Sequence, residues 1–304
     1  ENNESVRRLL EVERPRAAFT SIEFKLKEIH PPLLVQMLSA IAKNSRDKAG
    51  EYLLDEYYVR LAFQLINLNS DLTLEEKAGL ELTYLEALTR SFQGEDQQQI
   101  PNLELYIEEH PELFVRAVVW TYKRRDGGED PAEFRVREGR EHLALRGHCL
   151  LEAIERIPGQ DQATKEEHKK KLADWVATVR RSCAELDRAE IADVCLGKLF
   201  SNAPTGEDGV WPNEAVRDVM EDLQSENISR GAHIGLYNAR GVHCRGEGGD
   251  QEQKLADKYR VWADALQFTH PFVSSSLLMS MVNTYEREAK QHDTEACIQR
   301  RLKH

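Results

Sequence analysis

The stretch "GEYLLDEYYVRLAFQLINL" (residues 50–68) contains the periodicity that decides the fold. Its apolar side chains recur at intervals of three and four residues, so they share one face of an α-helix. The members of this stripe are Leu54, Tyr57, Tyr58, Leu61, Leu65 and Leu68. We therefore predict an amphipathic helix here that buries one face against a neighbour.

The same period extends over almost the whole chain. It is clear in "PPLLVQMLSAIAKN" (31–44) and "PELFVRAVVWTYKR" (111–124), whereas "EFRVR" (133–137) is the single hint of a strand. Further helices are predicted at 138–156, 166–186, 189–202, 213–223, 227–238, 250–268 and 272–290. The pattern predicts an all-α protein, either an irregular helical-pair repeat of the α-solenoid type or a large helical bundle.

Capping residues predict where two of these helices begin. Thr73 precedes Glu76 by three residues, a capping-box spacing that opens a helix running to about Phe92. Asp250 and Gln253 have the same spacing, which predicts Asp250 as the N-cap of the next helix.

Three predicted helix junctions contain a His-Pro step, at His30, His110 and His270. Proline suits the first position of a helix and disfavours helical geometry in the residue before it. We interpret the three steps as ordinary helix punctuation, because the repeat that their spacing invites has no counterpart near residue 190.

One segment, "SNAPTGEDGVWP" (201–212), is rich in turn residues and marks the expected subdomain boundary. We expect a helical array over residues 1–203. Residues 204–304 would then form a C-terminal helical subdomain that contains a loop rich in Gly and Arg.

Composition excludes some classes of function and disfavours others. The 304 residues carry a net charge of −12, from 53 acids and 41 bases, which argues against binding to nucleic acid. No apolar stretch reaches the ~18 to 20 residues of a membrane span, and no secretory signal pattern is present. The five cysteines are scattered without a CxxC pair, so neither a disulfide framework nor a zinc site is expected. We expect a cytoplasmic protein with no cofactor.

The stretch "RGAHIGLYNARGVHCRG" (230–246) is the candidate site, because it contains three arginines and no acid in an acidic chain. Arg and Tyr are enriched in protein contact surfaces. The candidate residues for binding a partner or an anion are Arg230, Tyr237, Asn238, Arg240, His243 and Arg245. The alternative is that these arginines neutralise nearby acidic helices.

Two catalytic interpretations of the same region are weaker. Its glycines precede a helix, as in phosphate-binding loops, yet Glu247 and Asp250 stand where an anion would bind, and no GxxxxGK[ST] motif occurs. His243 and Cys244 are adjacent, which is a poor spacing for zinc, and no orienting third group is evident for a thiol nucleophile.

Three segments carry a family resemblance: "GVWPNEAVRDVMEDL" (209–223), the stretch 229–266 and "NTYEREAKQHDTEA" (283–296). They resemble the C-terminal helical region of large bacterial multidomain proteins, some of which pair it with an NTPase or effector module in antiphage defence. The resemblance implies a helical region without catalytic residues of its own. The start at Glu1 is what we expect of a processed chain or a part of such a protein.

We therefore expect a non-enzymatic α-helical scaffold that binds a protein partner. The alternative is an enzyme or a nucleotide- or anion-binding domain in which Arg240 and Arg245 grip a small anionic ligand. Nucleic-acid binding through the same stretch is the least favoured of the three, because the rest of the chain is acidic.

Overall fold

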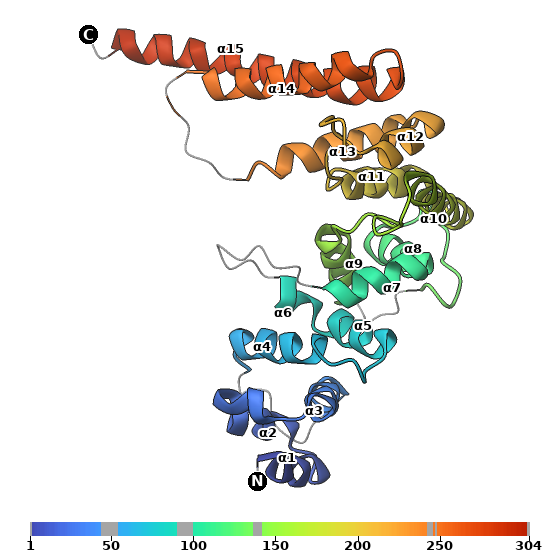
Figure 1. Cartoon of the computed structure of the whole chain (residues 1–304), viewed down its shortest axis with the longest axis vertical. Coiled ribbons are helices and arrows are strands. Elements are labelled where there is room, and N and C mark those ends of the chain that lie inside the picture. Colours follow the sequence, from blue (N-terminus) through green and yellow to red (C-terminus); the bar gives the residue numbers. More distant parts are fainter. Residues whose placement is uncertain are drawn as a thin grey trace. The chain divides into compact units, whose positions relative to one another are not determined.

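The structure is a computed structural model that describes residues 2–43, 54–89, 100–135, 142–241, 246 and 248–302. Over these residues it contains helices and no strand, so the all-α prediction is confirmed (Figure 1). The described part of "EFRVR", residues 133–135, lies in and after a turn. Across the same described ranges, no helix is both long enough and apolar enough to cross a membrane.

The chain forms two compact units, each described by itself. Unit 1 comprises residues 1–110 and 145–154, and unit 2 comprises residues 111–144 and 155–304. The segment 201–212, where we expected a subdomain boundary, lies within unit 2.

Unit 1 is built from short helices. They are α1 (Asn2–Glu11), α2 (Pro15–Ile22), η1 (Glu23–Glu28), α3 (Pro31–Lys43), α4 (Glu56–Asn67), α5 (Leu74–Thr83), α6 (Leu85–Thr89), α7 (Pro101–Glu109) and most of α9 (His142–Ala153). Helices α1 to α7 and η1 pack on helices close to them in the sequence. The predicted apolar stripe at 31–44 is buried as α3: Leu33, Leu34, Met37, Leu38 and Ile41 belong to the core. The stripe predicted for residues 54–68 is wrong, because Tyr57 and Leu68 are exposed and α4 buries another face, made of Val59, Ala62, Phe63 and Ile66.

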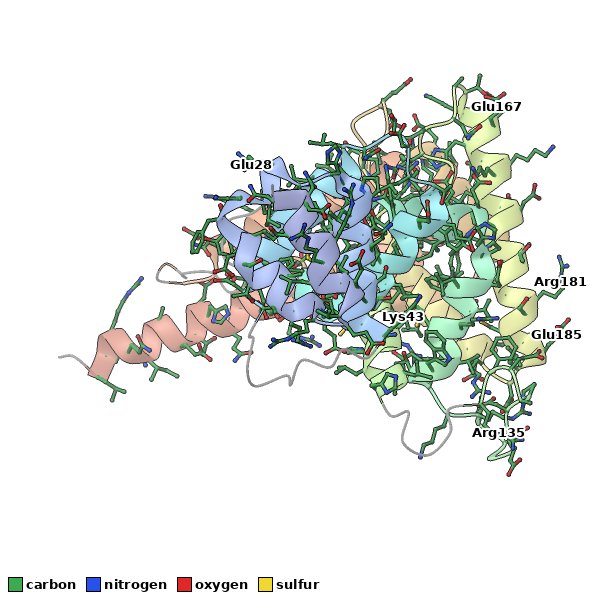
Figure 2. All side chains as sticks on the ribbon, turned by 90° about the horizontal axis from the view of Figure 1, so that it is seen from below. Glu28, Lys43, Arg135, Glu167, Arg181 and Glu185 are labelled. Atoms are coloured by element: carbon green, nitrogen blue, oxygen red, sulfur yellow. The ribbon has the colours of Figure 1, made fainter. Side chains whose placement is uncertain are left out.

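Unit 2 is a series of packed helix pairs (Figure 1). Its helices are α8 (Pro111–Thr121), α10 (Lys165–Glu185), α11 (Ala189–Phe200), α12 (Glu214–Leu223), α13 (Glu226–Asn238), α14 (Asp250–Leu266), η2 (Val273–Leu278) and α15 (Met279–Leu302). Polar side chains such as Arg181 and Glu185 project from α10 (Figure 2). The loop at 201–212 is tied to α14, because the Trp262 indole N–H donates to Gly209 O at 3.1 Å.

The structure confirms most of the predicted helix starts. Helices begin at Pro31 and Pro111, and the last helical run begins at Pro271. The Thr73 capping box is present, but the helix predicted from there to about Phe92 is not continuous, because α5 ends at Thr83 and α6 covers Leu85–Thr89. Its predicted end at Phe92 lies outside the described residues. The break falls at Tyr84, whose hydroxyl donates to Leu38 O of α3 at 2.8 Å.

Glycines set the distance between α11 and α13. A Cβ atom added to Gly197 of α11 would lie 2.0 Å from Ile228 O, and one added to Gly231 of α13 would lie 2.1 Å from Val194 O. One turn further along α13, a Cβ on Gly235 would meet the Ser201 hydroxyl at 2.1 Å. The two backbones therefore approach closely enough to exclude any side chain at the first two positions.

A further close contact explains the start of α14 and corrects the predicted cap. The N-cap is Gly249, not Asp250, and Gly249 has no side chain with which to cap the helix. A Cβ on Gly249 would lie 2.3 Å from Ala289 O of α15. Only glycine can therefore occupy this position, where the backbone before α14 contacts α15. Gln253, the expected capping-box partner, instead donates to Asp257 at 2.9 Å.

We predict that Gly197→Ala destabilises unit 2 by about 1–3 kcal/mol or more, because the α11 and α13 backbones must separate to admit the methyl group. Gly79→Ala is the matched control: Gly79 also lies inside a helix, but a Cβ there has no neighbour within 4 Å. It should stabilise the chain by about 0.5–1 kcal/mol. Urea unfolding of both variants checks this, and equal effects would contradict the proposed close packing.

Candidate functional site

The candidate residues lie on and after α13, whose first turn is anchored to α11. The Ser225 hydroxyl donates to Asp193 Oδ2 at 2.6 Å and accepts from the Ile228 N–H as the N-cap. The Arg180 guanidinium donates to both oxygens of Asp193, at 2.8 and 3.1 Å. Together with the glycine contact, this cluster holds α13 rigidly on one side, so its opposite side has a defined position.

Tyr237 faces α15. Its hydroxyl donates to Glu288 Oε1 at 2.5 Å, and its ring stacks on Tyr285, with 6.2 Å between the ring centroids. Tyr285 is buried and stacks in turn on Tyr259 of α14, at 5.8 Å. Tyr237 itself is 39% exposed. It therefore contributes to the packing of α13 on α15 and also presents one edge to solvent.

Arg240 is committed to an internal ion pair. Its guanidinium donates to Glu252 Oε1 at 2.7 Å and lies 5.6 Å from the centre of the Tyr285 ring. The Glu252 side chain is 1% exposed and that of Arg240 is 16% exposed. Burial alone would raise the pKa of Glu252, but the hydrogen bond from Arg240 holds it below its ordinary value. The sequence left two roles open for Arg240: binding a partner or an anion, or neutralising an acidic helix. The contact with Glu252 of α14 corresponds to the second role.

The other candidates divide into two groups. Arg230 and Asn238 are exposed on α13, and across the described ranges no carboxylate pairs with Arg230. His243 and Arg245 lie outside the described residues. The structure thus brings Tyr237 and Arg240 together on α15 and leaves Arg230 accessible on α13.

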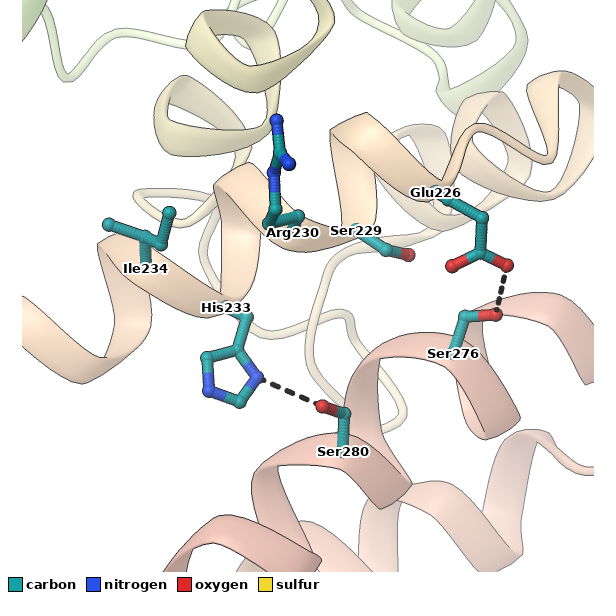
Figure 3. Close-up of a pocket in the computed structure, with 7 residues that line it drawn as sticks. All are labelled: Glu226, Ser229, Arg230, His233, Ile234, Ser276 and Ser280. Carbon is teal, nitrogen blue, oxygen red and sulfur yellow. Dashed lines mark hydrogen bonds between the residues drawn. The ribbon is translucent and has the colours of Figure 1, made fainter.

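A groove of about 320 Å³ lies between α13 and the start of the last helical run (Figure 3). Its lining residues are Glu226, Ser229, Arg230, His233, Ile234, Ser276 and Ser280. The Ser276 hydroxyl donates to Glu226 Oε1 at 3.2 Å, and the Ser280 hydroxyl lies 3.2 Å from His233 Nδ1. Figure 3 shows the His233 ring on the α15 side, while Arg230 extends away from it.

The α15 side of the groove begins with a π-helical segment, η2. Its N-terminal amides are satisfied by α12, since both oxygens of Glu221 accept from the Phe272 N–H at 3.1 and 3.0 Å. Ser274 is held inside the fold by donating to Ala263 O at 2.8 Å. π-Helical turns are rare and occur often at functional sites. The local widening turns Ser276 toward Glu226 across the groove.

Sequence reasoning missed most of this groove. Of the lining residues it named only Arg230 as a candidate, and Ser274 to Ser276 fall inside the helix predicted at 272–290. A run of three serines inside a helix with an apolar stripe was the available signal. It does not say which hydroxyl faces a neighbouring helix, because that depends on the π-helical register.

The described residues were also compared with the requirements of a metal site and of a reactive thiol. In those ranges, no three His, Cys, Asp or Glu side chains are grouped so as to hold a metal ion. Cys149, Cys183, Cys195 and Cys297 are free thiols, and burial raises the pKa of Cys183 and Cys149, which disfavours the thiolate. His243 and Cys244 lie outside the described ranges.

Glu81 is a strongly perturbed carboxyl of unit 1. It is fully buried, and burial raises its pKa to about 7. It accepts hydrogen bonds from the Leu103 N–H at 2.7 Å and from the Asn102 amide at 2.6 Å. Perturbed carboxyls mark functional sites in some proteins. Here the contacts join α5 to the first turn of α7, which is a structural role.

The fold and the site define an all-α protein of packed helix pairs with a polar groove beside α13. Comparison with protein-family models, with curated proteins and with solved structures found no match.

We predict that Arg240→Ala lowers the free energy of unfolding by about 3–5 kcal/mol, because the buried Glu252 carboxylate loses the guanidinium that neutralises it. Arg125→Ala is the control, since the Arg125–Glu190 pair has side chains 76% and 65% exposed, and it should cost less than about 1 kcal/mol. In a double-mutant cycle, Arg240→Ala with Glu252→Ala should cost less than the sum of the single changes. Additive costs would mean that the two side chains do not depend on each other.

The raised pKa of Glu81 predicts a pH-dependent stability. The ordinary pKa is 4.5, so as pH rises from 4.5 to 7 the unfolded chain loses this proton more readily than the folded chain. The free energy of unfolding should fall over that range by about 3 kcal/mol relative to the Glu81→Gln variant, which has no such proton. Urea unfolding of both proteins between pH 4.5 and 8 measures the difference, and a constant difference would contradict the assignment.

Proposed function

We propose that this chain is a non-enzymatic helical scaffold that recognises a protein partner through the exposed side of α13. The observation that carries the proposal is Arg230, an exposed cation on a rigidly held helix, beside a polar groove. Arginine is enriched where proteins contact one another, and a preformed surface loses little conformational entropy on binding.

The neighbouring residues support a contact surface centred on α13. The edge of Tyr237 and the side chain of Asn238 are exposed two turns along the same helix. The helix packs on α11 through the Gly197–Gly231 contact on one side and on η2 on the other. An extended array of helix pairs presents such surfaces repeatedly, as helical-repeat proteins do.

The alternative function, binding of a small anion, relied on Arg240 and Arg245. Arg240 is occupied by Glu252, so an anion held by Arg240 and Arg245 would have to break a buried ion pair. The resemblance of residues 209–296 to helical regions of large bacterial proteins, including antiphage-defence proteins, supports a role as the sensor or interaction arm of such a protein.

An affinity pull-down from cells of the source organism tests the proposal. We expect wild-type chain to recover a specific partner and Arg230→Glu to reduce its recovery at least fivefold, because the charge at the contact is reversed. Arg181→Glu reverses an exposed arginine on α10 of the same unit (Figure 2) and should leave recovery unchanged. Equal recovery with Arg230→Glu and Arg181→Glu would count against the role of α13.

A further inference from the structure

The groove between α13 and η2 contains a buried hydroxyl with no partner. Ser229 is 3% exposed, and where the chain is described its Oγ makes no hydrogen bond. Serines inside helices commonly bond to a main-chain carbonyl, as Ser274 and Ser275 do here. An unsatisfied buried hydroxyl costs about 1–3 kcal/mol. Ser229 lines the groove, so a polar group that enters it can satisfy this hydroxyl.

The charge of the groove favours an uncharged occupant. Glu226 and Arg230 carry opposite charges, so their formal charges cancel. Burial, and next the positive charge of Arg287, lower the pKa of His233, which disfavours the protonated ring. Its nitrogens lie 3.2 Å from the Ser280 hydroxyl and 3.5 Å from the Thr284 hydroxyl. A full negative charge would meet Glu226.

The hydrogen-bonding groups favour an occupant with both a donor and an acceptor. Ser229 has a hydroxyl proton to donate, and Glu226 accepts one hydrogen bond from Ser276 and has a second carboxylate oxygen. Figure 3 shows the Ser229 hydroxyl directed to the same end of the groove as Glu226. A carboxamide has one carbonyl acceptor and two N–H donors, which match these two groups.

We propose that this groove binds the carboxamide side chain of an Asn or Gln residue carried by the protein partner. The carbonyl oxygen accepts from Ser229, and the amide nitrogen donates to Glu226. A volume of about 320 Å³ is at the lower end of the range for small-ligand sites, which suits one side chain and its flanking peptide groups. This inference rests on the proposed function, because the partner supplies the side chain.

The test uses the full chain, ¹⁵N-labelled, and amide chemical shifts as the readout. The probes are the N-acetyl, N-methylamide derivatives of Gln, Asn, Glu and Lys, and inorganic phosphate, each titrated into the millimolar range. We expect the Gln or the Asn probe to shift the Ser229, Ser276 and Ser280 signals saturably, and the charged probes to leave them in place. Shifts caused equally by the Glu probe, the Lys probe or phosphate would overturn the proposal.

Two serine variants locate the contact. Ser229→Ala should weaken binding of the Gln or Asn probe about fivefold or more, the loss of one hydrogen bond of about 1 kcal/mol. Ser275→Ala is the control. Ser275 belongs to η2, its hydroxyl donates to Pro271 O at 2.7 Å, and it does not line the groove. Unchanged binding with Ser229→Ala would overturn the assignment of this hydroxyl.

The pull-down and the probe titration test the two proposals independently. Unchanged partner recovery with Arg230→Glu counts against the proposed function. Carboxamide probes that do not bind the wild-type chain count against the further inference, even if Arg230→Glu still reduces partner recovery.

Discussion

The close contact of α11 with α13 is the constraint on which the C-terminal part of unit 2 depends. At Gly197 and Gly231 the two backbones meet without intervening side chains, so any residue larger than glycine would push the helices apart. Helices at ordinary separations tolerate exchanges of side chains, but backbone contact does not, because main-chain atoms cannot change rotamer. The Ser225–Asp193–Arg180 cluster then fixes the rotation of α13 about its axis.

This contact has consequences on the other side of α13. Because the helix is fixed on α11, the side chains of Ser229, His233 and Tyr237 meet the last helical run at set positions. Arg240 and Glu252 neutralise each other beside the stacked tyrosines, which joins the end of α13 to α14 and α15. The groove therefore lies between two helical elements that are each anchored elsewhere in the fold.

Much of the fold was predictable from the sequence, since helical periodicity and capping residues are local. The stripe in α3 and the helix starts at Pro31 and Pro111 follow from spacing and backbone preference. In α4 the helix was predicted but its buried face was not, because Val59, Ala62, Phe63 and Ile66 are buried there. The errors occurred where a tertiary contact overrides local preference. Tyr84 ends α5 early to reach Leu38, and Gly249 takes the cap position from Asp250 because it must pass Ala289.

By itself, the sequence determined the all-α class, most helix boundaries and the position of an unusual stretch rich in Gly and Arg. Only the tertiary structure decided which contacts the described residues of that stretch make, because their partners lie elsewhere in the chain. Gly231, Gly235 and Gly249 are contact points between backbones or with a facing side chain. Arg240 is the partner of a buried acid 12 residues away, whereas Arg230 is left exposed. Arg230 on α13 and Arg240 just after it thus differ in their surroundings. Arg240 is largely buried beside a carboxylate, whereas Arg230 is exposed.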